Sequence, residues 1–94
     1  MDEQKSLLML VDSFLEGKMK CQKFCDRFEH QWNFEIGGED MNEQVLDLFN
    51  QLFDVVVWYS PFPKDRQDYP GYLDQDQVKE KVRTLREQLR PLEN

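Results

Sequence analysis

Cys21, Cys25 and His30 are the most reactive side chains in this 94-residue sequence. Thiolates and an imidazole can hold a zinc ion or form a nucleophile–base pair if they face one another. Cys21 and Cys25 lie four residues apart in a helical pattern, a spacing that rarely permits a disulfide. His30 lies five residues beyond Cys25, about 140° around the same helix. We therefore expect two reduced thiols in the core, with no metal site and no cofactor.

Carboxylates are the other candidates for chemistry, since the chain holds 19 Asp and Glu. A paired acid–base site among them is an open alternative, although no pair stands out. The glycines match no phosphate-binding motif, and no serine lies in a nucleophile-elbow context. We expect that the protein is not an enzyme.

The charge is concentrated in one third of the chain. The net charge is −7, and the window of residues 28–63 contains seven carboxylates but no Lys or Arg. Nucleic acid and anionic membranes are bound by Lys and Arg, so this balance argues against both as direct ligands. It favours a basic protein partner. No stretch approaches the ~20 apolar residues of a membrane span, and the expected location is the cytoplasm.

The elements that position these residues follow from apolar spacing of three and four residues. Four helices are predicted: residues 4–16 ending at Gly17, a segment from about residue 18 toward Gly37-Gly38, about 19 residues opened by Asp40 and Glu43, and a last helix from Asp74 to Pro91. The run 55–59 is β-branched, but we interpret it as helix because the helical period continues into it. The predicted fold is a single all-α domain over residues 1–94, a four-helix antiparallel bundle with a long ordered loop, 60–73, between helices 3 and 4.

The third predicted helix has a polar face without cations. One stripe follows steps of three and four residues through Asp40, Glu43, Asp47, Asn50 and Asp54, and the next step of the same spacing reaches Trp58. A solvated helix face, with Trp58 closing the end of the bundle, is the simplest interpretation. The alternative is a protein interface, because large aromatics beside an unbalanced charge patch supply burial and steering. Tyr59, Phe62, Tyr69 and Tyr72 extend this aromatic cluster into the loop.

Three stretches carry a family resemblance: "FLEGKM" early, "LDLFNQLFDVVVWYSP" in the middle and "DYPGYLDQDQVKEKVRTLREQL" at the end. Over residues 7–90 the chain resembles the colicin D-type immunity proteins, including those of contact-dependent growth-inhibition systems. The resemblance implies a bacterial protein that binds one cognate toxin, typically a tRNA-cleaving nuclease, as a 1:1 complex. Its acidic residues would cover the basic active site.

The family places important carboxylates at the end of the third helix and in the loop that follows, where this sequence reads Val57, Trp58, Tyr59 and Ser60. Combining stripe and loop, we predict a partner-binding site made of eight residues: Glu43, Asp47, Asp54, Trp58, Tyr59, Asp65, Asp68 and Tyr69. The alternative function is an acidic helical adaptor, or a nucleic-acid mimic, that docks on a basic protein without a toxin partner.

Overall fold

The computed structural model of the protein describes residues 3–35 and 41–92. This part of the chain is all-α, as predicted: an isolated parallel β-bridge between Tyr59 and Leu73 is its only β-structure. Its elements are α1 (Glu3–Leu15), α2 (Cys21–His30), the π-helical turn η1 (Gln31–Glu35), α3 (Glu43–Val57), α4 (Pro63–Asp68), α5 (Gln75–Leu89) and the 3-10 turn η2 (Arg90–Leu92). No helix among these is long and apolar enough to cross a membrane.

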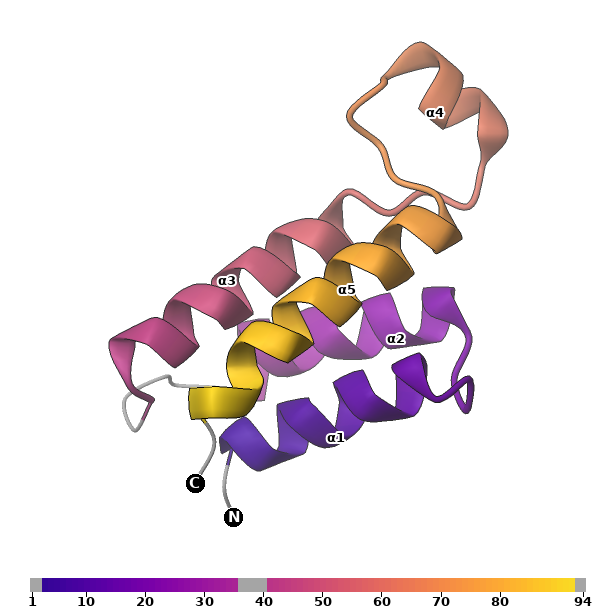
Figure 1. Ribbon diagram of the computed structural model, residues 1–94. Helices are drawn as coiled ribbons and strands as arrows, with labels where there is room; N and C mark the ends of the chain where they lie inside the picture. Colours follow the sequence, from indigo (N-terminus) through magenta and orange to yellow (C-terminus); the bar gives the residue numbers. More distant parts are fainter. Residues whose placement is uncertain (1–2, 36–40, 93–94) are drawn as a thin grey trace.

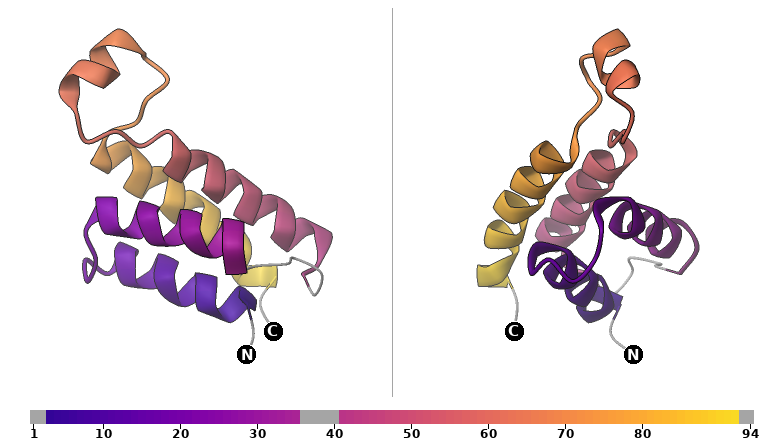
Figure 2. Two further views of the ribbon diagram at one scale, coloured as in Figure 1. Left: turned by 180° about the vertical axis from the view of Figure 1, so that it is seen from behind. Right: turned by 90° about the vertical axis from the view of Figure 1, so that its right-hand side faces the viewer.

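The four longer helices form two antiparallel pairs. α1 and α2 lie side by side and run in opposite directions, as do α3 and α5 (Figure 1). The right-hand view of Figure 2 shows α1 and α2 nearly end-on but α3 and α5 at a slant, so the two pairs cross. α2 contacts α3 and α1 contacts α5, which closes one core between the pairs.

Aromatic rings fill much of this core. Phe14 of α1 stacks on Phe24 of α2 with ring centroids 4.4 Å apart and planes within 5° of parallel. Phe28 joins Phe24 to Phe49 of α3, and all three of these rings are fully buried. The predicted apolar stripes of α1, α2 and α5 are therefore confirmed as the buried faces of these helices.

Gly17 ends α1 as the sequence predicts. Its φ of +81° is a left-handed conformation that L side chains rarely adopt. The amide of Gly17 donates to Phe14 O at 3.1 Å, and that of Lys18 donates to Ser13 O at 2.9 Å. This is a Schellman closure. It occupies residues 17–18, so the second helix begins at Cys21 and the predicted start near Lys18 is wrong.

The start of the third helix also differs from the prediction. Asn42 is its N-cap, with a side-chain oxygen that accepts from Gln44 N at 2.7 Å and Val45 N at 3.3 Å. The predicted box of Asp40 and Glu43 is therefore wrong, because Asn42 already satisfies the amides at this end. Asp40 and Gly37-Gly38 lie outside the described residues. The helical interpretation of residues 55–59 is confirmed for 55–57 but wrong for the last two residues, because α3 stops at Val57 and Tyr59 forms a bridge with Leu73.

The segment 60–73 is not a loop without secondary structure. It contains α4, a six-residue helix that begins with Pro63 and carries Asp65 in its first turn. Proline at the first helical position and a carboxylate near the helix N-terminus both favour a helix start. By contrast, the capping box of Asp74 and Gln77 at the start of α5 is confirmed, with reciprocal bonds of 2.8 and 2.9 Å.

A buried arginine forms an ion pair between α5 and α1. Arg86 of α5, whose side chain is 6% exposed, donates from Nε to Asp12 Oδ1 at 2.7 Å and from Nη2 to Asp12 Oδ2 at 3.3 Å. The Asp12 side chain is 41% exposed, so water weakens its attraction to the guanidinium.

We expect Asp12→Ala to lower the free energy of unfolding by about 1–2 kcal/mol. Removing one partner of a fully buried pair costs more, about 3–5 kcal/mol, but here the carboxylate is partly solvated. Urea unfolding measures the difference. Glu87→Ala is the control, because Glu87 pairs with Arg90 on the exposed face of α5 and should contribute less than about 0.5 kcal/mol. Equal stabilities of the two variants would contradict this role of Asp12.

Candidate partner-binding site

The acidic stripe of α3 is on the surface. Glu43, Asp47, Asn50 and Asp54 are all exposed, and α3 carries no Lys or Arg. None of the ion pairs found in residues 3–35 and 41–92 involves these three carboxylates. The one side-chain bond on the stripe is from Gln51 Nε2 to Asp47 Oδ2, at 3.0 Å. No cation on α3 compensates these three carboxylates. Their negative charges therefore add in the electrostatic field outside this face of the helix.

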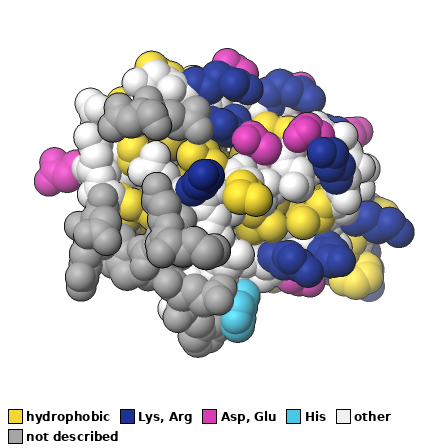
Figure 3. Space-filling view, turned by 90° about the horizontal axis from the view of Figure 1, so that it is seen from below, with side chains coloured by type: hydrophobic (Ala, Val, Ile, Leu, Met, Phe, Trp, Pro, Cys, Tyr) yellow, Lys and Arg dark blue, Asp and Glu magenta, His cyan; other side chains and the backbone are white. Residues whose placement is uncertain are grey.

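The face that carries α1 does not share this segregation. Seen from below, the face that carries α1 shows Lys and Arg side chains interspersed with Asp and Glu (Figure 3). α5 carries both cations and carboxylates, including the pair of Arg83 and Glu80. Among the longer described helices, α3 is therefore the one whose carboxylates have no cation on the same helix.

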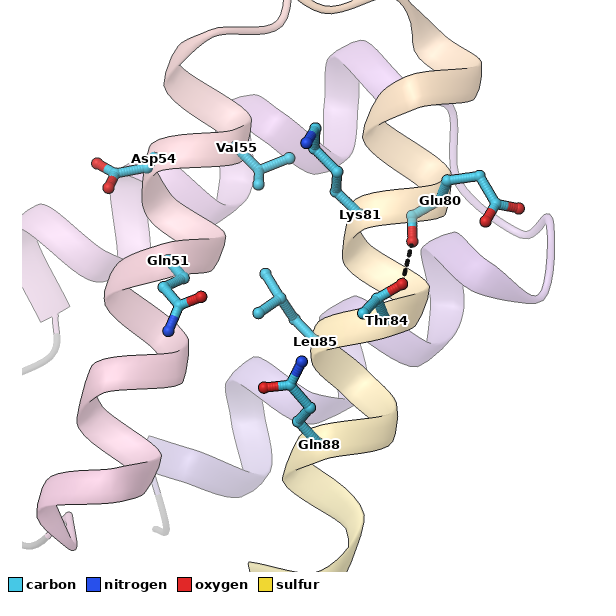
Figure 4. A pocket seen from close by; sticks show the side chains of 8 residues that line it. All are labelled: Gln51, Asp54, Val55, Glu80, Lys81, Thr84, Leu85 and Gln88. Carbon is cyan, nitrogen blue, oxygen red and sulfur yellow. Dashed lines mark hydrogen bonds between the residues drawn. The ribbon is translucent and has the colours of Figure 1, made fainter.

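A shallow surface groove of about 480 Å³ is lined by residues of α3 and α5. Figure 4 shows that Asp54 points away from this groove, whereas Lys81 of α5 reaches over its upper end. The second carboxylate at its edge, Glu80, also points outward, on the far side of α5. Asp54 and Glu80 thus do not converge as a paired acid–base site requires.

Among the carboxyl groups of the described residues, Glu29 has a perturbed pKa. Burial, with the nearby Asp26, raises the pKa of Glu29 on α2. The groove on that side of the molecule is lined by Asp26, Arg27, His30 and Gln31, and Glu29 is not among its lining residues. This arrangement supplies no evident partner for proton transfer to a bound substrate.

The thiols lie in the core as predicted. Cys21 and Cys25 are reduced and buried. The hydrogen bond between them lowers the pKa of Cys21, and the same bond, together with burial, raises the pKa of Cys25. His30 is exposed, and within the described ranges no three His, Cys, Asp or Glu side chains come together as a metal site.

The predicted aromatics separate into exposed and internal groups. Trp58 is 48% and Tyr69 64% exposed, and each contacts the ring of Tyr72, with centroids 5.5 and 5.9 Å apart. Trp58 thus does not close the end of the core. Tyr59 is half-buried against the core, where burial raises the pKa of its phenol. Of the neighbouring residues Trp58 and Tyr59, Trp58 has the ring that is more accessible to a partner.

The two predicted carboxylates beyond α3 belong to α4. Asp65 and Asp68 are both exposed, but Asp65 Oδ2 accepts a hydrogen bond from Ser60 Oγ at 3.0 Å. Lys64 and Arg66 lie on the same short helix, so it is electrically neutral. The eight predicted residues therefore comprise an acidic part on α3 and a neutral aromatic part beyond it.

Two residues of this second part were not in the predicted site. Phe62 is 63% exposed, and the prolines on both sides of it, Pro61 and Pro63, are a signal for an extended, outward-held segment. Ser60 is 4% exposed and bonds to its neighbours on several sides. No local sequence signal indicates that Ser60 is buried. Its burial depends on Leu73, which is distant in the sequence and accepts a hydrogen bond from the Ser60 amide.

Compared with models of known protein families, the chain matches none. A comparison with curated proteins also gives no significant match. The fold and the site define the class of the molecule: a small all-α protein with an exposed, cation-free acidic helix face that leads into exposed aromatic side chains.

Proposed function

We propose that this protein is an immunity protein that binds and neutralises a nuclease toxin, of the tRNA-cleaving type, by covering its basic active site. The observation that supports this most directly is the continuity of the α3 stripe with an exposed Trp58. The resemblance over residues 7–90 points to the same function. We also propose the four-helix antiparallel bundle as the architectural class of the two crossed helix pairs.

The mechanism follows from charge and coverage. A nuclease cleft must be positive to hold phosphates, so the carboxylates of α3 would steer the two proteins together. Aromatic side chains buried on contact would then slow dissociation. Covering the cleft excludes RNA, and the inhibitor needs no catalytic group, metal or cofactor. A bacterial cytoplasmic location and a 1:1 complex are part of this proposal.

An acidic helical adaptor, or a nucleic-acid mimic acting on another basic protein, is the second candidate. The same α3 stripe favours it, because the stripe would suit any basic surface. The neighbouring reading frame separates the two candidates, since an immunity protein is encoded beside its toxin.

The test uses the nuclease domain that this proposal predicts to be encoded immediately upstream of this protein. Cleavage of tRNA by that domain should stop at one equivalent of the protein, and the association rate should fall markedly as salt is raised. Polyglutamate at equal charge concentration is the control for charge alone and should leave cleavage largely intact. Full cleavage in the presence of excess protein, or an association rate that ignores ionic strength, would contradict the proposed function.

A further inference from the structure

Residues 58–73 form a projecting arm, which we call the aromatic arm. It leaves the body where α3 ends and returns where α5 begins, and Figures 1 and 2 show it standing clear of the four longer helices. α4, in its middle, contributes no buried residue. The arm therefore adds little to the core that holds the rest of the protein together.

The base of the arm is closed by backbone bonds. Leu73 N donates to Trp58 O at 2.7 Å, and Ser60 N donates to Leu73 O at 3.0 Å, which makes the parallel bridge between Tyr59 and Leu73. These bonds join positions 15 and 13 residues apart, so they fix the two ends of the arm relative to each other.

Ser60 then organises the interior of the arm. Its Oγ donates to Asp65 Oδ2 at 3.0 Å and accepts from Phe62 N at 3.3 Å, while its carbonyl accepts from Arg66 Nη1 at 2.7 Å. Polar side chains are thus used inside the arm to hold its shape. An element held in this way loses little conformational entropy when it binds.

The arm holds aromatic side chains in water. Five large hydrophobic side chains are exposed in the part of the chain that the structure describes, and four of them lie at positions 57–69: Val57, Trp58, Phe62 and Tyr69. An ordered segment that exposes such side chains, and whose central helix α4 contributes no buried residue, is typical of an interaction surface.

Charge indicates what this surface meets. The arm contains Lys64, Arg66, Asp65 and Asp68 and is neutral, so it would not steer a partner. The charged residues of the α3 stripe that leads to its base are all carboxylates. A basic protein whose positive cleft adjoins an apolar pocket fits both parts, whereas RNA would be repelled by the stripe.

We propose that the aromatic arm is a pre-organised wedge that inserts Phe62 and Tyr69 into an apolar pocket beside the basic cleft of the partner. This inference rests on the proposed function and assigns the arm a separate task. The α3 stripe accelerates encounter, and the arm slows dissociation. Because the arm projects from the body, its site on the partner must be concave.

The experiment compares Phe62→Ala/Tyr69→Ala with Met9→Ala in binding to the upstream-encoded nuclease domain. Met9 is 64% exposed on α1, a helix that lies far from the arm in Figure 1, and is the matched control. The double variant should dissociate about 30–1000-fold faster, with the association rate and its salt dependence unchanged, because two hot-spot aromatics are lost. The control should match the wild type. Thermal unfolding should be nearly unchanged in both variants.

Each other outcome has a distinct meaning. If the wild-type protein inhibits the nuclease and the double variant binds equally well, the arm inference is overturned while the proposed function stands. If the wild type does not bind, the proposed function is overturned and the assigned partner of the arm with it. If tRNA alone quenches Trp58 fluorescence in the wild type but not in the double variant, the arm is an RNA-stacking surface and the inference is wrong.

The pre-organisation itself is tested without a partner. In the protein alone, the amides of Ser60 and Leu73 should exchange with deuterium much more slowly than unstructured amides, because both donate across the base of the arm. Ser60→Ala should accelerate exchange at Leu73 without affecting the amides of α2. Unprotected exchange at Leu73 in the wild type would overturn the rigid wedge.

Discussion

Phe24→Ala is expected to remove about 3–5 kcal/mol from the free energy of unfolding. Phe24 is fully buried, stacks on Phe14 between α1 and α2, and also contacts the ring of Phe28. Its truncation removes the transfer energy of the ring and leaves a cavity between two helices. A domain of this length has a total stability of roughly 5–14 kcal/mol, so a large part of it would be lost.

Thermal and urea unfolding, followed by circular dichroism, measure this effect. The midpoint temperature should fall by about 12–40 °C, given a shift of about 4–8 °C per kcal/mol for small domains. Phe62→Ala is the matched control, since the same substitution at a 63% exposed position should change stability by less than about 0.5 kcal/mol. Similar losses in the two variants would show that the core does not lie where α1 meets α2.

Reversing the charge at Asp47 and Asp54 is expected to slow association with the basic partner by about 10–100-fold at low salt. Asp47→Lys/Asp54→Lys changes the charge by four units on the one helix that has no cation. The dissociation rate should change much less, because long-range steering acts before contact. The difference should largely disappear near 1 M salt, where the Debye length is about 3 Å.

Stopped-flow association with the nuclease domain measures this effect. Glu16→Lys/Glu87→Lys is the matched control, because it changes the net charge equally at two exposed positions away from α3. An equal slowing by both double variants would assign the steering to total charge and not to the stripe. Unaltered association in the α3 variant would move the interface elsewhere on the molecule.

Local signals were sufficient for most helices. The apolar spacing of α1 and α5, the left-handed Gly17 and the Asp74–Gln77 box all act within a few residues, so their effects can be recognised without tertiary contacts. Reliance on local signals also explains one error, the predicted opening of the third helix by Asp40 and Glu43. Asn42 and Asp40 both have side chains suitable for a cap, and the local sequence does not distinguish them, whereas the structure has Asn42 as the N-cap.

α4 was missed for a different reason. A six-residue helix is too short to be stable alone, so propensity within it is a weak signal. It is ordered because Ser60 and Arg66 hold its start against the base of the arm, and the base is closed by Leu73. Those contacts join separate parts of the segment and have no local pattern.

The candidate site divides in the same way. The sequence by itself determined which face of α3 is apolar and which is acidic, because helical periodicity assigns each residue to a face and the absence of Lys and Arg is a matter of composition. Only the tertiary structure decided that Trp58 is exposed while Tyr59 packs on the core. The physical reason is that the direction of the chain after Val57 depends on where α5 begins, and hence on how the two helix pairs cross.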